Sequence, residues 1–190
     1  SAFTRFVIIR HGFHQQLPAS FSSGFKFTLD DGTGQAVLLM WLSTYDELAD
    51  PTGLNRSAQV RATGRVEEYE GTLQIVPASG ADVEVVAPGQ AEAPRRETGS
   101  LTADDVGVQV AVEGMVTRVE PFSGGQRVWI DDGSGEVMIL LWDNIYQRVP
   151  KRDRLVPGAW AQVTGVVEEY RGALEVVPAL PQDIEVRSGE

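Results

Sequence analysis

The sequence predicts an all-β protein made of two tandem copies of one small domain, and three observations support this prediction. The stretch Phe27–Trp41 returns as Val128–Trp142, and both contain the turn Asp-Asp-Gly-(Thr/Ser)-Gly. The flanking residues are β-branched or aromatic, as strands prefer, and glycine supplies the positive φ that a tight reversal needs. The register is constant, because Tyr69 and Tyr170 are 101 positions apart, as are the two Trp residues that end the repeated stretch. A period of this length is that of a whole domain.

Each copy is expected to begin with a bent strand, at Phe6–Arg10 in the first copy and Val108–Val116 in the second. A glycine near each strand, Gly12 and Gly114, would ease the bend. Two serine- and glycine-rich stretches come next and are expected to be flexible connections into the second strand. They are Phe21–Gly24 and Phe122–Gly125.

The second strand alternates, so its two faces have different characters. In the first copy, Phe27 and Leu29 share the face expected in the core, and Lys26 and Thr28 share the other. The matching core pair in the second copy is Val128 and Ile130, and the matching outer pair is Arg127 and Trp129. The third strand is apolar on both faces, which predicts an outer face with unusually many apolar side chains.

The rest of each copy is expected to be a short helix, two more strands and a final extended piece. A capped helical turn is predicted at Ser43–Leu48, with a counterpart at Asp143–Val149. The fourth strand is predicted at Val60–Tyr69 and Trp160–Tyr170, with Val60, Ala62, Gly64, Val66 and their counterparts Ala161, Val163, Gly165, Val167 in the core. The fifth ends at Pro77 or Pro178, before Asp82–Val86 or Asp183–Arg187.

The domain boundaries follow from the repeat and from a change in composition. Residues 1–87 form the first copy, residues 88–100 form a linker that begins rich in Pro, Ala and Gly, and residues 101–190 form the second copy. At the start of the second copy, Leu101–Asp105 is expected to cap a short turn.

This order of elements resembles the OB-fold, in particular the nucleic-acid-binding OB domains of the tRNA-anticodon and helicase type. The resemblance is carried by Phe27–Gly34, Gly64–Val66, Glu68–Gly71 and their counterparts 101 positions later. It implies two tandem five-stranded β-barrels, each with a short helix between the third and fourth strands. In such domains the ligand crosses the second and third strands, flanked by the loops between strands one and two and strands four and five.

Carried onto this sequence, the resemblance implies a set of aromatic, polar and basic binding residues. They are Lys26, Thr28, Trp41, Arg61, Arg65 and Tyr69 in the first copy, and Arg127, Trp129, Trp142 and Tyr170 in the second. Trp129 beside Arg127 suits the stacking of a base, and burial of this indole against its neighbours is the alternative. For Trp41 and Trp142 a structural role is favoured.

A basic run, Pro150–Arg154, supplies two more candidates, Lys151 and Arg152, which could clamp phosphates. The alternative is that this run is simply a solvated loop.

The composition limits what the chain can bind. The formal net charge is −11, which opposes the binding of nucleic acid, so an anionic ligand must meet a local basic patch on an acidic body. The sequence has no cysteine, so neither disulfides nor thiolate metal sites can form. No stretch is apolar enough to span a membrane. A cytoplasmic location is favoured, and removal of a signal peptide before Ser1 is the alternative.

No arrangement of residues predicts catalysis, a cofactor or a metal. The Asp30–Asp31 and Asp131–Asp132 pairs lack the further ligands of a calcium loop and are explained by turn chemistry. His11 and His14 have no nearby carboxylate to complete a metal site.

The leading hypothesis is therefore a non-catalytic module that binds single-stranded DNA or RNA with low sequence specificity. The alternative is a module that binds a protein partner or a second copy of itself through the apolar outer face. A third hypothesis makes the chain a targeting module of a larger nuclease- or helicase-like protein.

Overall fold

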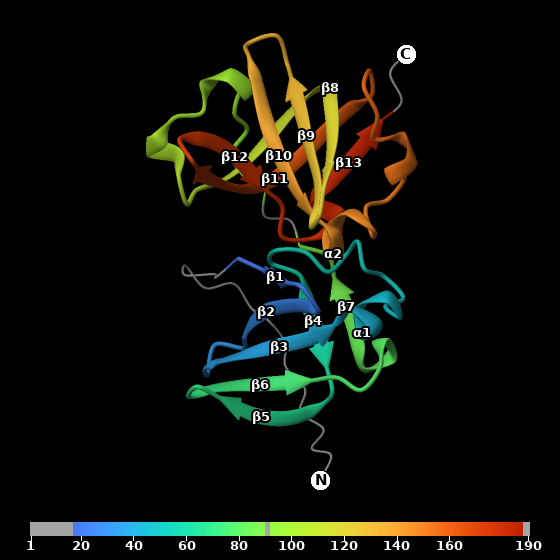
Figure 1. The fold of residues 1–190 in the computed structure, drawn as a ribbon. Coiled ribbons are helices and arrows are strands. Elements are labelled where there is room, and N and C mark those ends of the chain that lie inside the picture. Colours follow the sequence, from blue (N-terminus) through green and yellow to red (C-terminus); the bar gives the residue numbers. More distant parts are fainter. Residues whose placement is uncertain (1–16, 90–91, 188–190) are drawn as a thin grey trace. The chain divides into compact units, whose positions relative to one another are not determined.

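A computed structural model describes residues 17–89 and 92–187 of the chain, and these residues are mostly in β-strands (Figure 1). The chain divides between residues 91 and 92 into two compact units, which correspond to the two copies. The α-helices are short, α1 at Leu42–Asp46 and α2 at Asp143–Tyr146. Within the described ranges, no helix has the length and apolar character that crossing a membrane requires.

In the first unit, residues 17–89 form two sheets. The larger has the order β1-β2-β3-β6-β5, in which β3 and β6 are parallel and the other neighbours are antiparallel. Its strands are β1 (Ala19–Phe21), β2 (Gly24–Asp30), β3 (Gln35–Trp41), β6 (Thr72–Val76) and β5 (Arg65–Tyr69). The smaller sheet pairs β4 (Gln59–Ala62) with β7 (Val83–Ala87), after the short 3₁₀-helix η1 (Gly80–Asp82).

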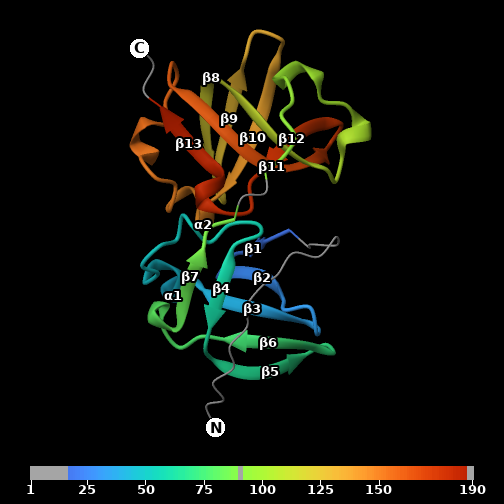
Figure 2. The same cartoon turned by 180° about the vertical axis from the view of Figure 1, so that it is seen from behind.

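The second unit contains one sheet whose pairings return to the strand where they start (Figure 2). Starting from β8, each strand pairs with the next in the order β9, β10, β12 and β11, and β11 pairs with β8 again. A further strand, β13 (Ile184–Arg187), pairs with β11. The ring consists of β8 (Gln109–Phe122), β9 (Gly125–Asp131), β10 (Glu136–Trp142), β12 (Ala173–Val177) and β11 (Trp160–Tyr170). Four 3₁₀-helices complete the unit: η2 (Thr98–Ser100), η3 (Ala103–Asp105), η4 (Arg152–Arg154) and η5 (Pro181–Asp183).

The alternation of the second strand is confirmed in both copies. Phe27 and Leu29 are buried, and so are Val128 and Ile130, while the residues between them are partly exposed. Burying one large apolar side chain contributes roughly 1.5–3 kcal/mol, so these pairs fix which face of the hairpin points inward. The side chains on the opposite face of this strand are left partly exposed; they are Lys26, Thr28, Arg127 and Trp129.

The core predicted for the fourth strand is confirmed in the second copy but not throughout the first. The first copy splits this strand into β4 and β5, and Val66 is 41% exposed. Its counterpart Val167 is buried, because the backbone of residues 107–108 is hydrogen bonded to it on both sides. The equivalent residues of the first copy, 6–7, lie outside the described residues, as do the predicted strand Phe6–Arg10 and the candidates His11 and His14.

Two predictions about connections were wrong. The stretches Phe21–Gly24 and Phe122–Gly125 are tight turns, because the end residues of each pair with one another in a β-hairpin. The helix predicted to be capped at Ser43 begins at Leu42 instead, and Trp41 is its N-cap without a side-chain hydrogen bond. The second copy is the same, with Trp142 as the N-cap of α2. Strand and helix thus follow each other directly, which fixes both indoles at the strand ends.

The segment between the copies is held at both of its ends. On the first unit, the N–H of Gly89 donates to Oδ1 of Asn55 at 2.6 Å. On the second, the N–H of Ala111 donates to the carbonyl of Pro94, and the N–H of Arg96 donates to the carbonyl of Ala111, both at 2.9 Å. Part of the expected linker, from Pro94 onward, therefore belongs structurally to the second unit.

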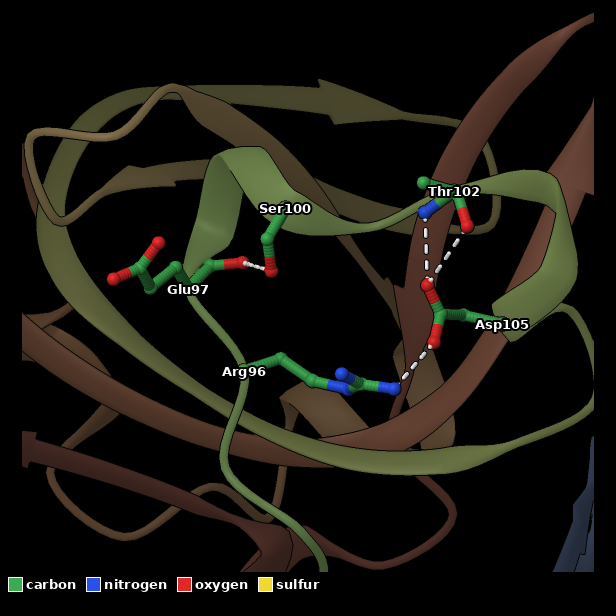
Figure 3. A network of polar contacts seen from close by, with 5 residues as sticks. All are labelled: Arg96, Glu97, Ser100, Thr102 and Asp105. Atoms are coloured by element: carbon green, nitrogen blue, oxygen red, sulfur yellow. Dashed lines mark hydrogen bonds and ion pairs between the residues drawn. The ribbon is translucent and has the colours of Figure 1, made fainter.

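Side-chain hydrogen bonds also link residues within the stretch 96–105 of the second unit (Figure 3). Arg96 Nη2 donates to Oδ1 of Asp105 at 2.9 Å, and the N–H of Thr102 donates to Oδ2 of the same carboxylate at 2.9 Å. The predicted cap of the turn at 101–105 is confirmed by this box between Thr102 and Asp105. Ser100 Oγ donates to the carbonyl of Glu97 at 2.8 Å.

Thr98 and Gly99 are hydrogen bonded to the repeated Asp-Asp-Gly turn of the second copy. Both the N–H and the hydroxyl of Thr98 donate to the carboxylate of Asp132, at 3.0 and 2.8 Å. Asp132 also accepts from the N–H of Ser134 at 2.9 Å, and the Ser134 hydroxyl accepts from the N–H of Gly99 at 2.9 Å. Hydrogen bonds from Ser134 and Thr98 hold the pKa of Asp132 well below its usual range.

Replacing Asp132 by asparagine is expected to loosen residues 98–100, because the charge-assisted hydrogen bonds to Thr98 are weakened. Amide hydrogen exchange of Thr98 should become about ten-fold faster at neutral pH. Since the folded-state pKa of Asp132 is lowered, its ionised form stabilises the second unit above a pH of about 4, and this contribution is lost as the pH falls further. The difference between the wild type and D132N should therefore shrink on acidification.

The matched control is Asp31→Asn in the first copy. Asp31 accepts from the N–H of Thr33 at 2.9 Å, as Asp132 does from Ser134, whereas Thr98 and Gly99 donate to Asp132 and Ser134 in the turn of the second copy. Exchange of Thr98 should be unchanged in this control. Equal exchange in wild type and D132N would contradict the role given to Asp132.

Candidate nucleic-acid interface

An exposed indole lies against a phenyl ring at the same place in each copy. The rings of Phe21 and Trp41 are 5.8 Å apart between centroids at an angle of 77°, and those of Phe122 and Trp142 are 5.7 Å apart at 74°. This edge-to-face arrangement is one that aromatic pairs prefer. Trp41 is 46% exposed and Trp142 is 43% exposed, so each indole is positioned by its neighbour without being covered by it.

Each hairpin turn brings a phenyl ring and an indole together, and this arrangement requires a glycine in the hairpin. Gly24 pairs with Trp41, and a Cβ atom on Gly24 would lie 2.2 Å from the carbonyl oxygen of Met40. Gly125 pairs with Trp142 in the same register, with a Cβ atom 1.9 Å from the carbonyl oxygen of Leu141. Only glycine permits this close approach of the two strands.

A cation lies over the phenyl ring of each pair. Lys26 Nζ is 5.7 Å from the centroid of Phe21, and Arg127 Cζ is 4.6 Å from the centroid of Phe122. Both are within the range of a cation–π interaction, which is worth about 0.5–1 kcal/mol at an exposed site. Among residues 17–89 and 92–187, neither cation forms a salt bridge. Each copy therefore presents an indole, a phenyl ring and a positive charge together.

Trp129 has a different neighbour from the one predicted. Arg118 of β8 stacks on its ring, with Cζ 3.8 Å from the centroid, while Arg127 stacks on Phe122. The pairing register explains this, since Trp129 is opposite Arg118. Arg118 also pairs with Glu120 at 3.2 Å and Glu136 at 4.0 Å. One face of the Trp129 indole is thus covered by a guanidinium. The equivalent residue of the first copy is Thr28, which has no aromatic ring.

The apolar outer face of the third strand is smaller than predicted. Leu39 of β3 and its counterpart Leu140 of β10 are buried, although they point to the outer side. Met138 is partly covered. What remains exposed at this face is mainly the indole at the end of each strand.

The basic candidates of the fourth strand lie away from the ring pairs. Arg61 is paired with Glu84 of β7 at 2.5 Å, and Arg65 is paired with Glu67. Both pairs are exposed, so each contributes little to stability, but the carboxylate offsets the charge that a phosphate would meet.

The basic run of the second copy forms η4, after α2 and in contact with β13. Arg152 donates to the carbonyl and the side chain of Gln147, and it lies 5.9 Å from the ring centroid of Tyr146. Lys151 adopts a left-handed backbone and lowers the pKa of nearby Glu185, after the larger effect of Arg187 on that carboxyl. The structure does not bring these cations to the Phe122–Trp142 pair.

Tyr69 is exposed at the turn between β5 and β6, and Tyr170 at the turn between β11 and β12, which is the predicted turn between the fourth and fifth strands. Arg171 lies 5.1 Å from the ring centroid of Tyr170. These tyrosines flank the sheet and are not in contact with the ring pairs in any interaction that the structure shows for the described residues.

The Asp-Asp-Gly turns are explained by turn chemistry, as predicted. Oδ1 of Asp30 accepts from the N–H of Gly32 at 2.8 Å, and Asp131 accepts from that of Gly133 at 2.7 Å. The carboxylates satisfy backbone donors in a tight reversal.

Sequence reasoning missed four residues of this surface: Phe21, Phe122, Arg118 and Glu175. The constant register held a signal for the first two, because Phe, the cation and Trp recur together 101 positions apart. Glu175 of β12 is 4% exposed, and it lies beside Met138 on the outer face. Nothing in its local pattern distinguishes a covered carboxylate from a solvated one.

Several solved structures resemble parts or all of the chain. An OBody, AM3L09, bound to hen egg-white lysozyme is 18% identical over 54% of this chain and 100% of its own, with a TM-score of 0.41. Asparaginyl-tRNA synthetase from Pyrococcus horikoshii, complexed with asparaginyl-adenylate, is 20% identical over 50% of this chain and 22% of its own, with a TM-score of 0.43. A murine DNA binding protein bound with double-stranded DNA is 10% identical over 100% of both chains, with a TM-score of 0.42. No curated protein matches the sequence.

One family matches the second copy, over residues 110–179. This range runs from the start of β8 to just beyond β12, so it contains nearly all of the ring of strands and the Phe122–Trp142 pair. Residues 110–179 therefore match the OB-fold nucleic acid binding domain of the tRNA anti-codon family, the family that the sequence pattern resembles.

Proposed function

We propose that the chain binds single-stranded DNA or RNA on the outer face of each copy, with little sequence preference, and that it catalyses no reaction itself. In this proposal both copies are OB domains, five-stranded barrels with a short helix after the third strand. The observation that supports it most is the constellation of phenyl ring, stacked cation and exposed indole, which occurs twice in the same register. Such binding needs neither a metal nor a cofactor.

The chemistry of this constellation suits a flexible strand of nucleotides. A base stacks on an aromatic face whatever its sequence, and each stacked base contributes about 1–3 kcal/mol. A duplex keeps its bases stacked on one another, so it would have to unpair before an indole could take one. Lys26 or Arg127, held over the neighbouring phenyl ring, is placed to meet the adjoining phosphate.

The net negative charge of the chain determines how strongly nucleic acid should bind and how the affinity should depend on salt. With a net charge of −11, long-range attraction of a polyanion is absent, and binding depends on contacts at short range. Arg61 and Arg65 add little because carboxylates offset them. The affinity should therefore be modest.

The test is a titration of the intact chain with oligo-dT and oligo-rU, followed by tryptophan fluorescence. Quenching is expected, with an affinity that falls as salt rises, at a slope of log K against log salt of about −0.7 per phosphate contacted. Duplex DNA of equal length should bind more weakly. A flat titration at low salt with both oligonucleotides would reject the proposal.

A second candidate function is a module that binds a protein partner or a second copy of itself. The arrangement that favours it is in the second copy, where Arg118 is offset by Glu120 and Glu136 on the same outer face as the exposed Trp142. Light scattering of the purified chain distinguishes the two candidates. A monodisperse monomer whose fluorescence oligo-dT quenches would exclude self-association as the role of this face.

A further inference from the structure

The two outer faces differ in charge at two positions of the same register. In the first copy, Lys26 is opposite Ala19 of β1, and β6 contributes Gln74 to the face. In the second copy, Arg127 is opposite Glu120 of β8, and β12 contributes Glu175. The cation of the first copy thus has neutral neighbours where that of the second has carboxylates.

Glu175 lies in a row of side chains that crosses the outer face. Its neighbour on β12, Val176, is buried against the core, so Glu175 points to the opposite, outer side. The strand register places it beside Met138 of β10 and opposite Glu168 of β11. The equivalent row of the first copy has Gln74 opposite Glu67. In this row of described residues, two carboxyl groups therefore lie directly across from one another in the second copy and not in the first.

The surroundings of Glu175 disfavour its ionised form. The residue is 4% exposed, and burial raises the pKa of its carboxyl. The charge of Glu168 raises this pKa further, while Arg127 lowers it. The other charges on this face, Arg118, Glu120 and Glu136, are paired with one another.

Ionised Glu175 weakens the second copy as a site for a polyanion in two ways. It offsets the charge of Arg127, which would otherwise meet a phosphate, and it repels the phosphate itself. A proton on Glu175 removes both effects, and Gln74 has no proton to gain or lose.

We propose that Glu175 sets the affinity of the second copy for single-stranded nucleic acid and makes that affinity rise on acidification, whereas Gln74 leaves the first copy without this dependence. The inference rests on the proposed function and goes beyond it by making the two copies unequal. The first copy is the tighter site at neutral pH.

The experiment follows each copy separately in the intact chain. The chain has four tryptophans, so indole N–H resonances of Trp41 report the first copy, those of Trp129 and Trp142 report the second, and Trp160 is a reference. Oligo-dT is titrated at pH 5.5 and 7.5, since thymine takes up no proton in this interval. The variants are Glu175→Gln and its mirror image, Gln74→Glu.

In the wild type, the affinity reported by Trp142 should rise as the pH falls from 7.5 to 5.5, because the pKa of Glu175 is raised and a proton removes its charge. Glu175→Gln should raise the affinity of the second copy at pH 7.5 by about five-fold, the effect of removing one like charge close to a phosphate, and its affinity should rise less on acidification than that of the wild type. Gln74→Glu should introduce the dependence into the first copy, and it tests the idea even if the first variant fails to fold.

Two negative results have different meanings. If the indoles shift with oligo-dT but E175Q retains the wild-type pH profile at Trp142, the role of Glu175 is wrong and the proposed function stands. If no indole shifts at either pH in any variant, the proposed function itself is wrong.

Discussion

Replacing both Phe21 and Trp41 by alanine is expected to weaken the binding of oligo-dT by the first copy about fifty-fold at neutral pH. The change removes the exposed indole and the phenyl ring that orients it, together with the surface on which Lys26 is held. Loss of one stacked base alone is worth about 1–3 kcal/mol, which is five- to 150-fold in affinity. What remains is binding by the second copy.

The measurement is fluorescence anisotropy of labelled oligo-dT, with circular dichroism to show that the variant is folded. Val86→Ala is the matched control, because Val86 is exposed on β7 of the smaller sheet, away from the ring pair. Its affinity should equal that of the wild type. Equal losses in the control and the double variant, or no loss in either, would remove the ring pair from the interface.

Replacing Gly24 by alanine is expected to destabilise the first unit by about 3 kcal/mol. The new methyl group would meet the carbonyl oxygen of Met40 at 2.2 Å and the ring of Phe21 at 2.8 Å. The backbone oxygen belongs to a paired strand and cannot move away, so the hairpin must separate from β3. Gly125→Ala is expected to do the same to the second unit, where the oxygen of Leu141 is 1.9 Å away.

The control is Gly34→Ala, where a Cβ atom would have nothing within 4 Å. Its effect on stability should be within about 0.5 kcal/mol. Urea unfolding of the three variants, followed by tryptophan fluorescence, measures the differences. If Gly24→Ala were as stable as the control, the close approach of the hairpin to β3 would not be what fixes the indole.

The sequence predicted the fold of each copy largely because the repeat supplied two independent versions of one pattern. Alternation in Phe27–Leu29 and Val128–Ile130 could be checked between copies, and both pairs are buried. The hairpins at Phe21 and Phe122 were missed because serine and glycine are equally common in mobile loops and in tight turns. Only the pairing of Phe21 with Gly24 decides between them.

The candidate site was predicted less completely because its charges are decided by pairing between strands. Arg61 has the same local pattern as a free cation, and its partner Glu84 lies on β7, a strand whose register the sequence does not specify. The same is true of Arg118, whose position over Trp129 follows from a bulge in β8 after Val116. The partner of Arg65, Glu67, is two residues along the same strand. Ring contacts and ion pairs across a sheet become visible only once the register is known.

The attachment of the inter-copy segment at Gly89 and again at Pro94 leaves four residues of connecting chain, 90–93. Even fully extended, a chain of this length reaches at most about 18 Å from one anchor to the next. If both copies bind as proposed, a nucleic-acid strand bound by one copy would meet the other at an effective concentration in the millimolar range. Two surfaces that bind weakly on their own would then bind one strand more tightly together, provided that the strand is long enough to reach both.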